Sequence, residues 1–183
     1  MARRAAGVAL AVGVVSVSLT GCGSSSPGTA TPTTTDKQAA TAALWDPCTQ
    51  IGSDTLQQLG VDQSSKDSGI GGVPQPGWKD CSWSYPPEHD QSVTIWSSIY
   101  TIDDYKQKAD NTDFMPITAA GRSGWKYHRV SDKNNEKCDL VFPAQSSVGA
   151  YEISFYNLEP GLTASPCDRA MSVANIVVPL FPR

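Results

Sequence analysis

The sequence predicts an α+β domain, in which helices pack on an antiparallel sheet of about five strands and two disulfides brace the fold. Apolar and polar residues alternate in several segments, as half-buried strands require. A segment near the C-terminus instead repeats apolar residues at helical spacing. One apolar helix face combined with several alternating strands indicates helices packed on an antiparallel sheet.

The first predicted element of the domain is a short helix with the sequence SDTLQQL. Ser53 is a suitable N-cap, the two leucines point inward, and Gly60 ends the helix. Residues 62–77 follow and are predicted to form a loop. The GIGG cluster within them lacks the Lys-Ser/Thr pair and the following helix of a phosphate-binding turn. We therefore interpret it as a flexible part of the loop.

Five segments are predicted to be strands: residues 80–85, 91–100, 124–130, 137–142 and 148–156. In the last of these, Tyr151, Ile153 and Phe155 share one face. Between the second and third strands, Thr101 begins a helix that runs to about residue 109, with an aspartate completing a capping box. The residues after this helix, through Pro116, are expected to form a loop.

The predicted C-terminal helix has the clearest pattern. Ser165 caps it, Pro166 lies in its first turn and Pro179 stops it. Its inward face consists of the residues at helical spacing: Cys167, Ala170, Met171, Ala174, Val177 and Val178.

The start of the chain has the features of a lipoprotein signal peptide. Arg3 and Arg4 precede an uncharged apolar run that is shorter than the roughly 20 residues of a membrane span. The run ends in Leu-Thr-Gly before Cys22, which resembles a bacterial lipobox. This resemblance implies cleavage before Cys22 and lipidation of its thiol. A plain secretory signal with Cys22 in a disulfide, or an uncleaved anchor, are the alternatives.

Three regions follow from this interpretation. Residues 1–21 are the predicted signal peptide, 22–43 the lipidated cysteine and a flexible Ser/Thr/Pro tether, and 44–183 a single globular domain. Two or more acyl chains hold a protein firmly on a bilayer. We expect the protein on the outer face of the cell membrane, anchored there through Cys22.

The four remaining cysteines are expected to form two disulfides, as is usual in an exported domain. Three pairings are possible. We favour Cys48–Cys81 with Cys138–Cys167, because each closes a moderate loop and ties an element to its neighbour. A zinc site is the rival interpretation, but the sequence has no Cys-x-x-Cys pair and only two histidines. We therefore predict no metal ligands and no cofactor.

The charge balance disfavours nucleic acid as a partner. Removing residues 1–21 deletes two of the 14 basic residues and none of the 18 acidic ones, which leaves a net charge near −6. Nucleic-acid binding depends on basic contacts to phosphate. The same balance argues against a polybasic patch on the membrane surface.

The sequence marks no catalytic residue. Residues 121–125, GRSGW, approach the nucleophile motif Gly-x-Ser-x-Gly but end in Trp125, so we interpret them as a turn before a strand. His89 is expected in an exposed turn and His128 on the rim of a strand. We predict that the protein is not an enzyme, with a hydrolase as the least favoured of three hypotheses.

The aromatic residues favour a binding function instead. Five Trp and six Tyr are available, and aromatic side chains line ligand pockets and interface cores. Trp45 and Trp78 lie at element edges and are the candidates for an exposed contact. The leading hypothesis is a tethered ligand-binding or sensor module for a small, apolar envelope ligand. The alternative is an accessory subunit that binds an envelope protein.

The order of motifs resembles one protein family. The lipobox and tether are followed by Trp-Asp-Pro-Cys48, Cys81-Ser-Trp, Gly-Arg122, Cys138 and a last helix opened by Cys167. This order is similar to that of the actinobacterial lipoproteins called domain of unknown function thirty-five fifty-eight, over essentially the whole mature chain. The resemblance implies location, fold and disulfides, and it supplies no catalytic residue.

Overall fold

The computed structural model describes residues 34–145, 149–158 and 165–182. The predicted signal peptide, Cys22 and the tether before residue 34 lie outside these residues. Among the helices of the described part, none has both the length and the apolar character needed to cross a membrane.

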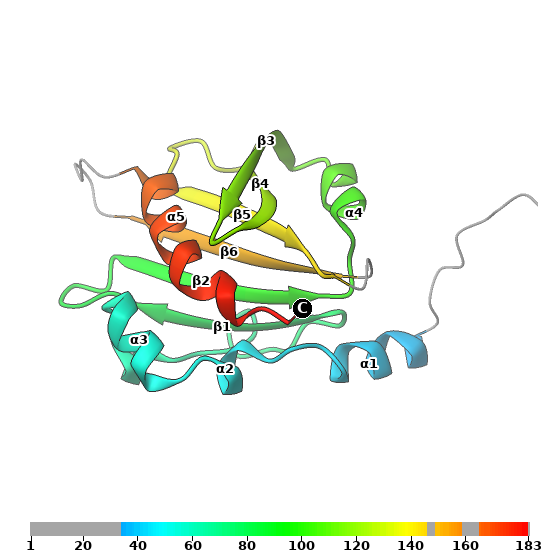
Figure 1. The fold of residues 1–183 in the computed structure, drawn as a ribbon, viewed down its shortest axis with the longest axis horizontal. Coiled ribbons are helices and arrows are strands. Elements are labelled where there is room, and N and C mark those ends of the chain that lie inside the picture. Colours follow the sequence, from blue (N-terminus) through cyan, green and yellow to red (C-terminus); the bar gives the residue numbers. More distant parts are fainter. Residues whose placement is uncertain (1–33, 146–148, 159–164, 183) are drawn as a thin grey trace, which may run out of the picture. The chain divides into compact units, whose positions relative to one another are not determined.

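The fold is an α+β domain built on one antiparallel sheet of six strands, which confirms the predicted class with one strand more than expected (Figure 1). The strand order is β1-β2-β6-β5-β4-β3. The strands are β1 Trp78–Ser84, β2 Gln91–Ser98, β3 Asn111–Ala119, β4 Arg122–Arg129, β5 Lys137–Pro143 and β6 Ala150–Asn157.

Helices lie on both faces of this sheet. The long α5 crosses one face, where it packs on β5 and β6, and the short α4 lies near β3 and β5 (Figure 1). The helices are α1 Thr34–Ala42, α2 Pro47–Gln50, α3 Ser53–Leu59, α4 Ile102–Gln107 and α5 Pro166–Val177, with two short 3-10 turns, η1 Gln63–Ser65 and η2 Val178–Leu180.

The main core lies between α5 and the sheet. Antiparallel register places alternate residues of neighbouring strands in rows, so that Ile95 of β2, Ile153 of β6 and Leu140 of β5 are adjacent and fully buried. Burying an aliphatic or aromatic side chain of this size stabilises a fold by roughly 1.5–3 kcal/mol. The apolar face of α5 closes this core through Ala170 and Val177.

Two disulfides fasten helices to the sheet, with the predicted pairing. Cys48–Cys81 joins α2 to β1, and Cys138–Cys167 joins β5 to the start of α5. Both links attach a helical segment to a neighbouring strand, as the loop lengths suggested.

The helix caps follow the sequence closely, with one shift. Thr101 and Asp104 form the predicted capping box of α4, and the Ser165 hydroxyl accepts a hydrogen bond from the Cys167 N–H at 3.2 Å. At α3 the N-cap is Gly52 rather than Ser53, which is the first helical residue. Gly60 ends α3 in the left-handed conformation, as predicted.

The strand β3 was not predicted, because residues 111–116 were expected to be a loop. It is an edge strand with an irregular register between Thr112 and Met115, and Asp113 has a φ of 55°. A bulge interrupts the alternation that identifies a strand in sequence. Pro116 is tolerated because an edge strand leaves one side unpaired.

Helix α1 covers residues 34–42, which the sequence predicted to be the end of a flexible tether. Three hydrogen bonds hold its C-terminal end and the residues after it against the loop before β1 and the start of β1. The Gly77 N–H donates to the Thr41 hydroxyl at 2.7 Å, and the Lys79 ammonium donates to the Ala42 and Leu44 carbonyls at 2.9 Å each. The composition of this segment gave no sign of these long-range contacts.

Candidate functional site

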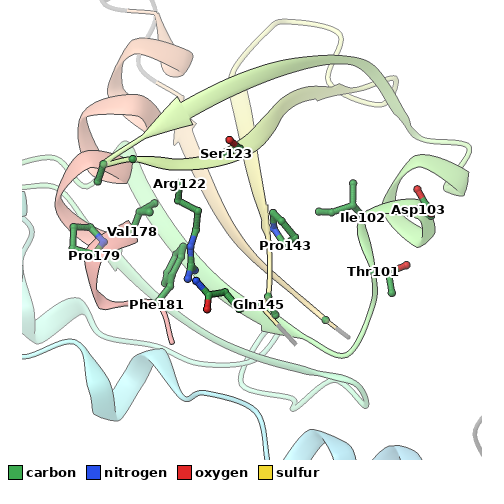
Figure 2. Close-up of a pocket in the computed structure, with 14 residues that line it drawn as sticks. Thr101, Ile102, Asp103, Arg122, Ser123, Pro143, Gln145, Val178, Pro179 and Phe181 are labelled. Atoms are coloured by element: carbon green, nitrogen blue, oxygen red, sulfur yellow. The ribbon is translucent and has the colours of Figure 1, made fainter. Parts of the chain in front are cut away.

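A groove with a volume of about 820 Å³ opens at one end of the sheet (Figure 2). Four parts of the chain line it: the start of α4, the turn between β3 and β4, the end of β5, and the C-terminal segment from η2 to Phe181. Volumes of this order are typical of small-molecule sites. The groove is therefore the candidate site of the described domain.

Arg122 is the central polar residue of the groove. Ala120 and Gly121, with φ values of 47° and 79°, reverse the chain, so that Arg122 is the first residue of β4. Its side chain runs from the strand toward Phe181 and Gln145 (Figure 2). The turn residues thus place a cationic side chain over the groove.

The Arg122 guanidinium is held in place on one side and has donor capacity left on the other. Nη2 donates a hydrogen bond to the Pro182 carbonyl at 2.7 Å. Nη1 is buried, and no described residue accepts a hydrogen bond from it. A buried donor without a partner costs about 1–3 kcal/mol. A ligand whose acceptor group reaches Nη1, which requires the Arg122 side chain to move and expose that atom, would remove this cost, and a carboxylate or phosphate suits a guanidinium best.

Aromatic rings form the floor beneath the guanidinium. It lies 5.8 Å from the ring centroids of both Tyr151 and Phe181, which are stacked on each other at 4.6 Å. Cation–π attraction at this range holds the guanidinium over the two rings. Burial raises the pKa of Tyr151, with Arg122 acting in the opposite direction, so the phenol is neutral at physiological pH.

The rest of the lining is mixed, with an apolar majority. Ile102, Pro143, Val178 and Phe181 supply apolar surface. Among the described residues that line the groove, Arg122 is the only cation and Asp103 the only acid. Asp103 belongs to α4, on the far side of the groove from Arg122 (Figure 2). The groove is thus suited to a ligand with one anionic group and apolar surface.

A second charged cluster is buried beneath α4 and is centred on Glu152 of β6. The Glu152 carboxylate accepts hydrogen bonds from the Tyr127 hydroxyl at 2.6 Å, the Arg129 guanidinium at 3.0 Å and the Tyr105 hydroxyl at 3.1 Å. Burial raises the pKa of Glu152 and the pKa of both tyrosines, and the cation Arg129 opposes the shift at each of the three groups.

Asp139 extends this cluster. It pairs with Arg129 at 2.8 Å and with Lys137 at 3.1 Å, and it accepts a hydrogen bond from Ser154. The two carboxylates, Asp139 and Glu152, are only 1% and 2% exposed. A substrate in solvent does not reach them, so we assign the cluster a structural role, in which each buried charge has a partner of opposite sign.

The aromatic residues singled out from the sequence are less exposed than expected. Trp45 and Trp78, the suggested exposed contacts, are both half-buried. Trp45 packs edge-on against Tyr151 and Phe181, with centroid distances of 5.9 Å and 5.5 Å. Trp78 lies in an aromatic cluster that also covers the Lys108 ammonium, 4.5 Å from the Trp78 ring centroid.

The two histidines lie as expected, whereas the GRSGW motif belongs to the predicted turn only at Gly121, because β4 begins at Arg122. His89 is in an exposed turn 3.1 Å from Asp62, and His128 is half-buried on β4. Gly121 forms the turn before β4, whereas Gly124 lies within the strand, where an added Cβ would come within 2.6 Å of the Phe142 ring. Within the described ranges no three His, Cys, Asp or Glu side chains are placed to hold a metal ion.

Comparison with known proteins gives a family and no relative of known activity. Neither a curated protein nor a solved structure matches the chain. A family model described as a protein of unknown function, DUF3558, matches residues 17–180, a range that contains all six strands and both disulfides. The chain therefore belongs to the DUF3558 family.

Proposed function

We propose that the protein is a non-enzymatic binding module that captures a small ligand in the groove at the end of its sheet. One observation carries the proposal: the buried Nη1 of Arg122 has no acceptor among the described residues and lies beside a groove of about 820 Å³. The ligand supplies the missing acceptor, in the form of a carboxylate or phosphate group.

The proposed place of action is the outer face of the cell membrane, where a lipid on Cys22 anchors the protein. The support is the lipobox sequence and the apolar run before it. The two disulfides are also in keeping with an exported domain, since disulfides persist in oxidising compartments.

A second candidate function is that of an accessory subunit that binds an envelope protein. The observation in its favour is the loop before β1, where Ile70 and Val73 are 63% and 59% exposed. These two residues face each other across a short turn closed by an isolated bridge. Exposed aliphatic side chains that are held together in this way suit a protein contact.

The test of the binding proposal is native mass spectrometry of residues 23–183, exported and recovered from the cell envelope. We expect a retained extra mass in the wild-type protein and its loss in Arg122→Gln. Arg169→Gln is the matched control, because Arg169 also lies over two rings, 5.0 Å from Tyr85 and 5.5 Å from Phe155, but does not line the groove. The control should retain the mass.

Two outcomes would contradict the proposal. A wild-type protein recovered with its bare calculated mass would remove the evidence for a captured ligand and favour the accessory subunit. A ligand retained equally by Arg122→Gln would show that the groove is not the site. Thermal unfolding of each variant checks that the Gln substitution leaves the domain folded despite the lost Pro182 bond.

A further inference from the structure

A second, smaller cavity lies beside the groove, with a volume of about 340 Å³. Its walls come from the end of α1 and the residues after it, from the end of β2, and from Ala144 and Tyr151 of the β5–β6 region. Most of the side chains are apolar, among them Ala40, Leu44, Trp45 and Ile99. No cation or acid is among the described residues that line it.

The two cavities adjoin each other. Ala144 lines both of them. Gly149 of the groove lies directly against the Ser98 carbonyl, and Ser98 lines the smaller cavity. At Gly149 the φ of 102° and this close contact exclude a side chain. The Gly149 and Ser98 backbones therefore pack against each other at this point, and Ala144 is the lining residue that the two cavities share.

The Tyr151 and Phe181 rings contact both Arg122 of the groove and Trp45 of the smaller cavity. The Arg122 guanidinium lies 5.8 Å from the Tyr151 and Phe181 centroids, and the Trp45 ring packs edge-on against these two rings. A molecule that contacts Arg122 and continues past Ala144 thus reaches a cavity with a tryptophan wall. The polarity along this path changes from cationic to apolar.

We infer that the ligand is an acidic amphiphile, whose carboxylate or phosphate head pairs with Arg122 and whose acyl chain passes Ala144 into the smaller cavity. This inference rests on the proposed function and specifies the ligand class. The head supplies the acceptor that Nη1 lacks. The acyl chain covers the apolar walls of the smaller cavity, and burial of this apolar surface drives binding of the amphiphile.

The inference also gives the end of α1 a role in binding. The apolar wall at Ala40, Leu44 and Trp45 is fastened to the sheet by the Thr41–Gly77 and Lys79 hydrogen bonds. Ala40 lies within the range predicted as the tether, residues 22–43, and Leu44 and Trp45 follow it directly in sequence. The tail of the amphiphile therefore lies on the segment that leads to the proposed lipid anchor.

The test is calorimetric titration of residues 23–183 with four probes: decanoate, decyl phosphate, butyrate and decanol. We expect one of the two ten-carbon acids to bind at least about tenfold more tightly than butyrate or decanol, since both the charge and the chain contribute. The tighter acid identifies the head as carboxylate or phosphate. Because this comparison uses the wild-type protein, it does not depend on the folding of any variant.

Two variants of α1 test whether the acyl chain of the ligand binds in the smaller cavity. Ala40→Phe fills the smaller cavity and should weaken decanoate or decyl phosphate about tenfold, while Ala39→Phe, the matched control on the adjacent exposed residue of α1, should bind as the wild type does. The Trp45 indole resonance should shift with the ten-carbon acids and stay in place with butyrate.

The experiments distinguish failure of the amphiphile inference from failure of the groove proposal. Equal affinity for butyrate and the ten-carbon acid, together with normal binding by Ala40→Phe, would overturn the amphiphile inference and leave the groove proposal standing. Binding that is unchanged in Arg122→Gln would overturn both. Absence of binding for all four probes, with a retained mass of another chemical class in the envelope-derived protein, would overturn the amphiphile inference alone.

Discussion

Asp80 is a buried carboxylate whose charge destabilises the folded state. It lies on β1, is 8% exposed, and accepts one hydrogen bond, from the Gly69 N–H at 3.0 Å. Burial raises the pKa of Asp80; the bond from Gly69 opposes this shift, and the nearby acids Asp67 and Asp46 add to it. A raised folded-state pKa means that the native state binds the proton more tightly than the unfolded chain does. Stability therefore falls as the pH rises from the unfolded-state pKa through the folded-state pKa.

We expect Asp80→Asn to raise the free energy of unfolding at pH 7, by an amount on the order of 1 kcal/mol. The amide keeps an oxygen for the Gly69 N–H and removes the buried charge. Urea unfolding at pH 7 and at about pH 3 measures the effect, which should vanish at the lower pH, below the unfolded-state value of about 3.9. Asp90→Asn, at an exposed turn, is the control and should change little. A loss of stability at pH 7 would mean that the charge itself is needed at this position.

The sequence predicted residues whose role is local and missed those whose role depends on tertiary packing. The capping box at Thr101 and the C-cap at Gly60 follow from neighbouring residues alone. Glu152 stands between two inward-facing residues of β6, so alternation places it on the opposite face, which is exposed in a sheet covered on one side only. Here Tyr105 of α4 lies on that face and donates a hydrogen bond to Glu152, which is buried. Arg122 was noticed only as part of a motif, because its importance depends on Pro182 and on two rings distant in sequence.

At the scale of elements, the disulfide between β5 and α5 is the clearest contribution to stability. Its cysteines are 29 residues apart, and in the chain-entropy account a loop of this length is worth roughly 3–4 kcal/mol. We expect the double variant Cys138→Ala/Cys167→Ala to lose about that much in urea unfolding. Cys48→Ala/Cys81→Ala, with a separation of 33, is the comparison and should lose a similar amount. A loss below about 1 kcal/mol for the first pair would show that packing alone constrains α5.

The elements that the sequence predicted are those with a regular period. β1, β2 and β6 alternate in sequence, and α5 has a continuous apolar face with a cap and a proline at its start. β3 was missed because its bulge breaks the alternation, and α1 because its fixation depends on Lys79 and Gly77, more than thirty residues away. Periodicity reports the environment of one element, and it carries no information about contacts that an irregular edge strand or a docked terminal helix makes elsewhere.

At the scale of the whole molecule, the position of the groove follows from the topology. The start of α4, the β3–β4 turn, the end of β5 and the C-terminal segment are far apart in sequence, and the antiparallel order of the strands brings them to one end of the sheet. The supply of aromatic residues suggests the proposed binding function. The location of the groove could not be predicted from the sequence, because it depends on which strand ends become neighbours.

The proposed anchor attaches the molecule to the membrane through Cys22, and the substitution Cys22→Ala tests this proposal. We expect the variant to incorporate no labelled fatty acid and to be either left unprocessed or released from the membrane, because in the lipobox interpretation Cys22 accepts the lipid and the signal is cut before it. Detergent phase partitioning and mass measurement of the N-terminus are the assays. The two disulfides should still form, since all four of their cysteines lie in the domain. If the variant stayed on the membrane with a normally processed N-terminus, another part of the chain would have to hold the protein there, and the lipobox interpretation would be wrong.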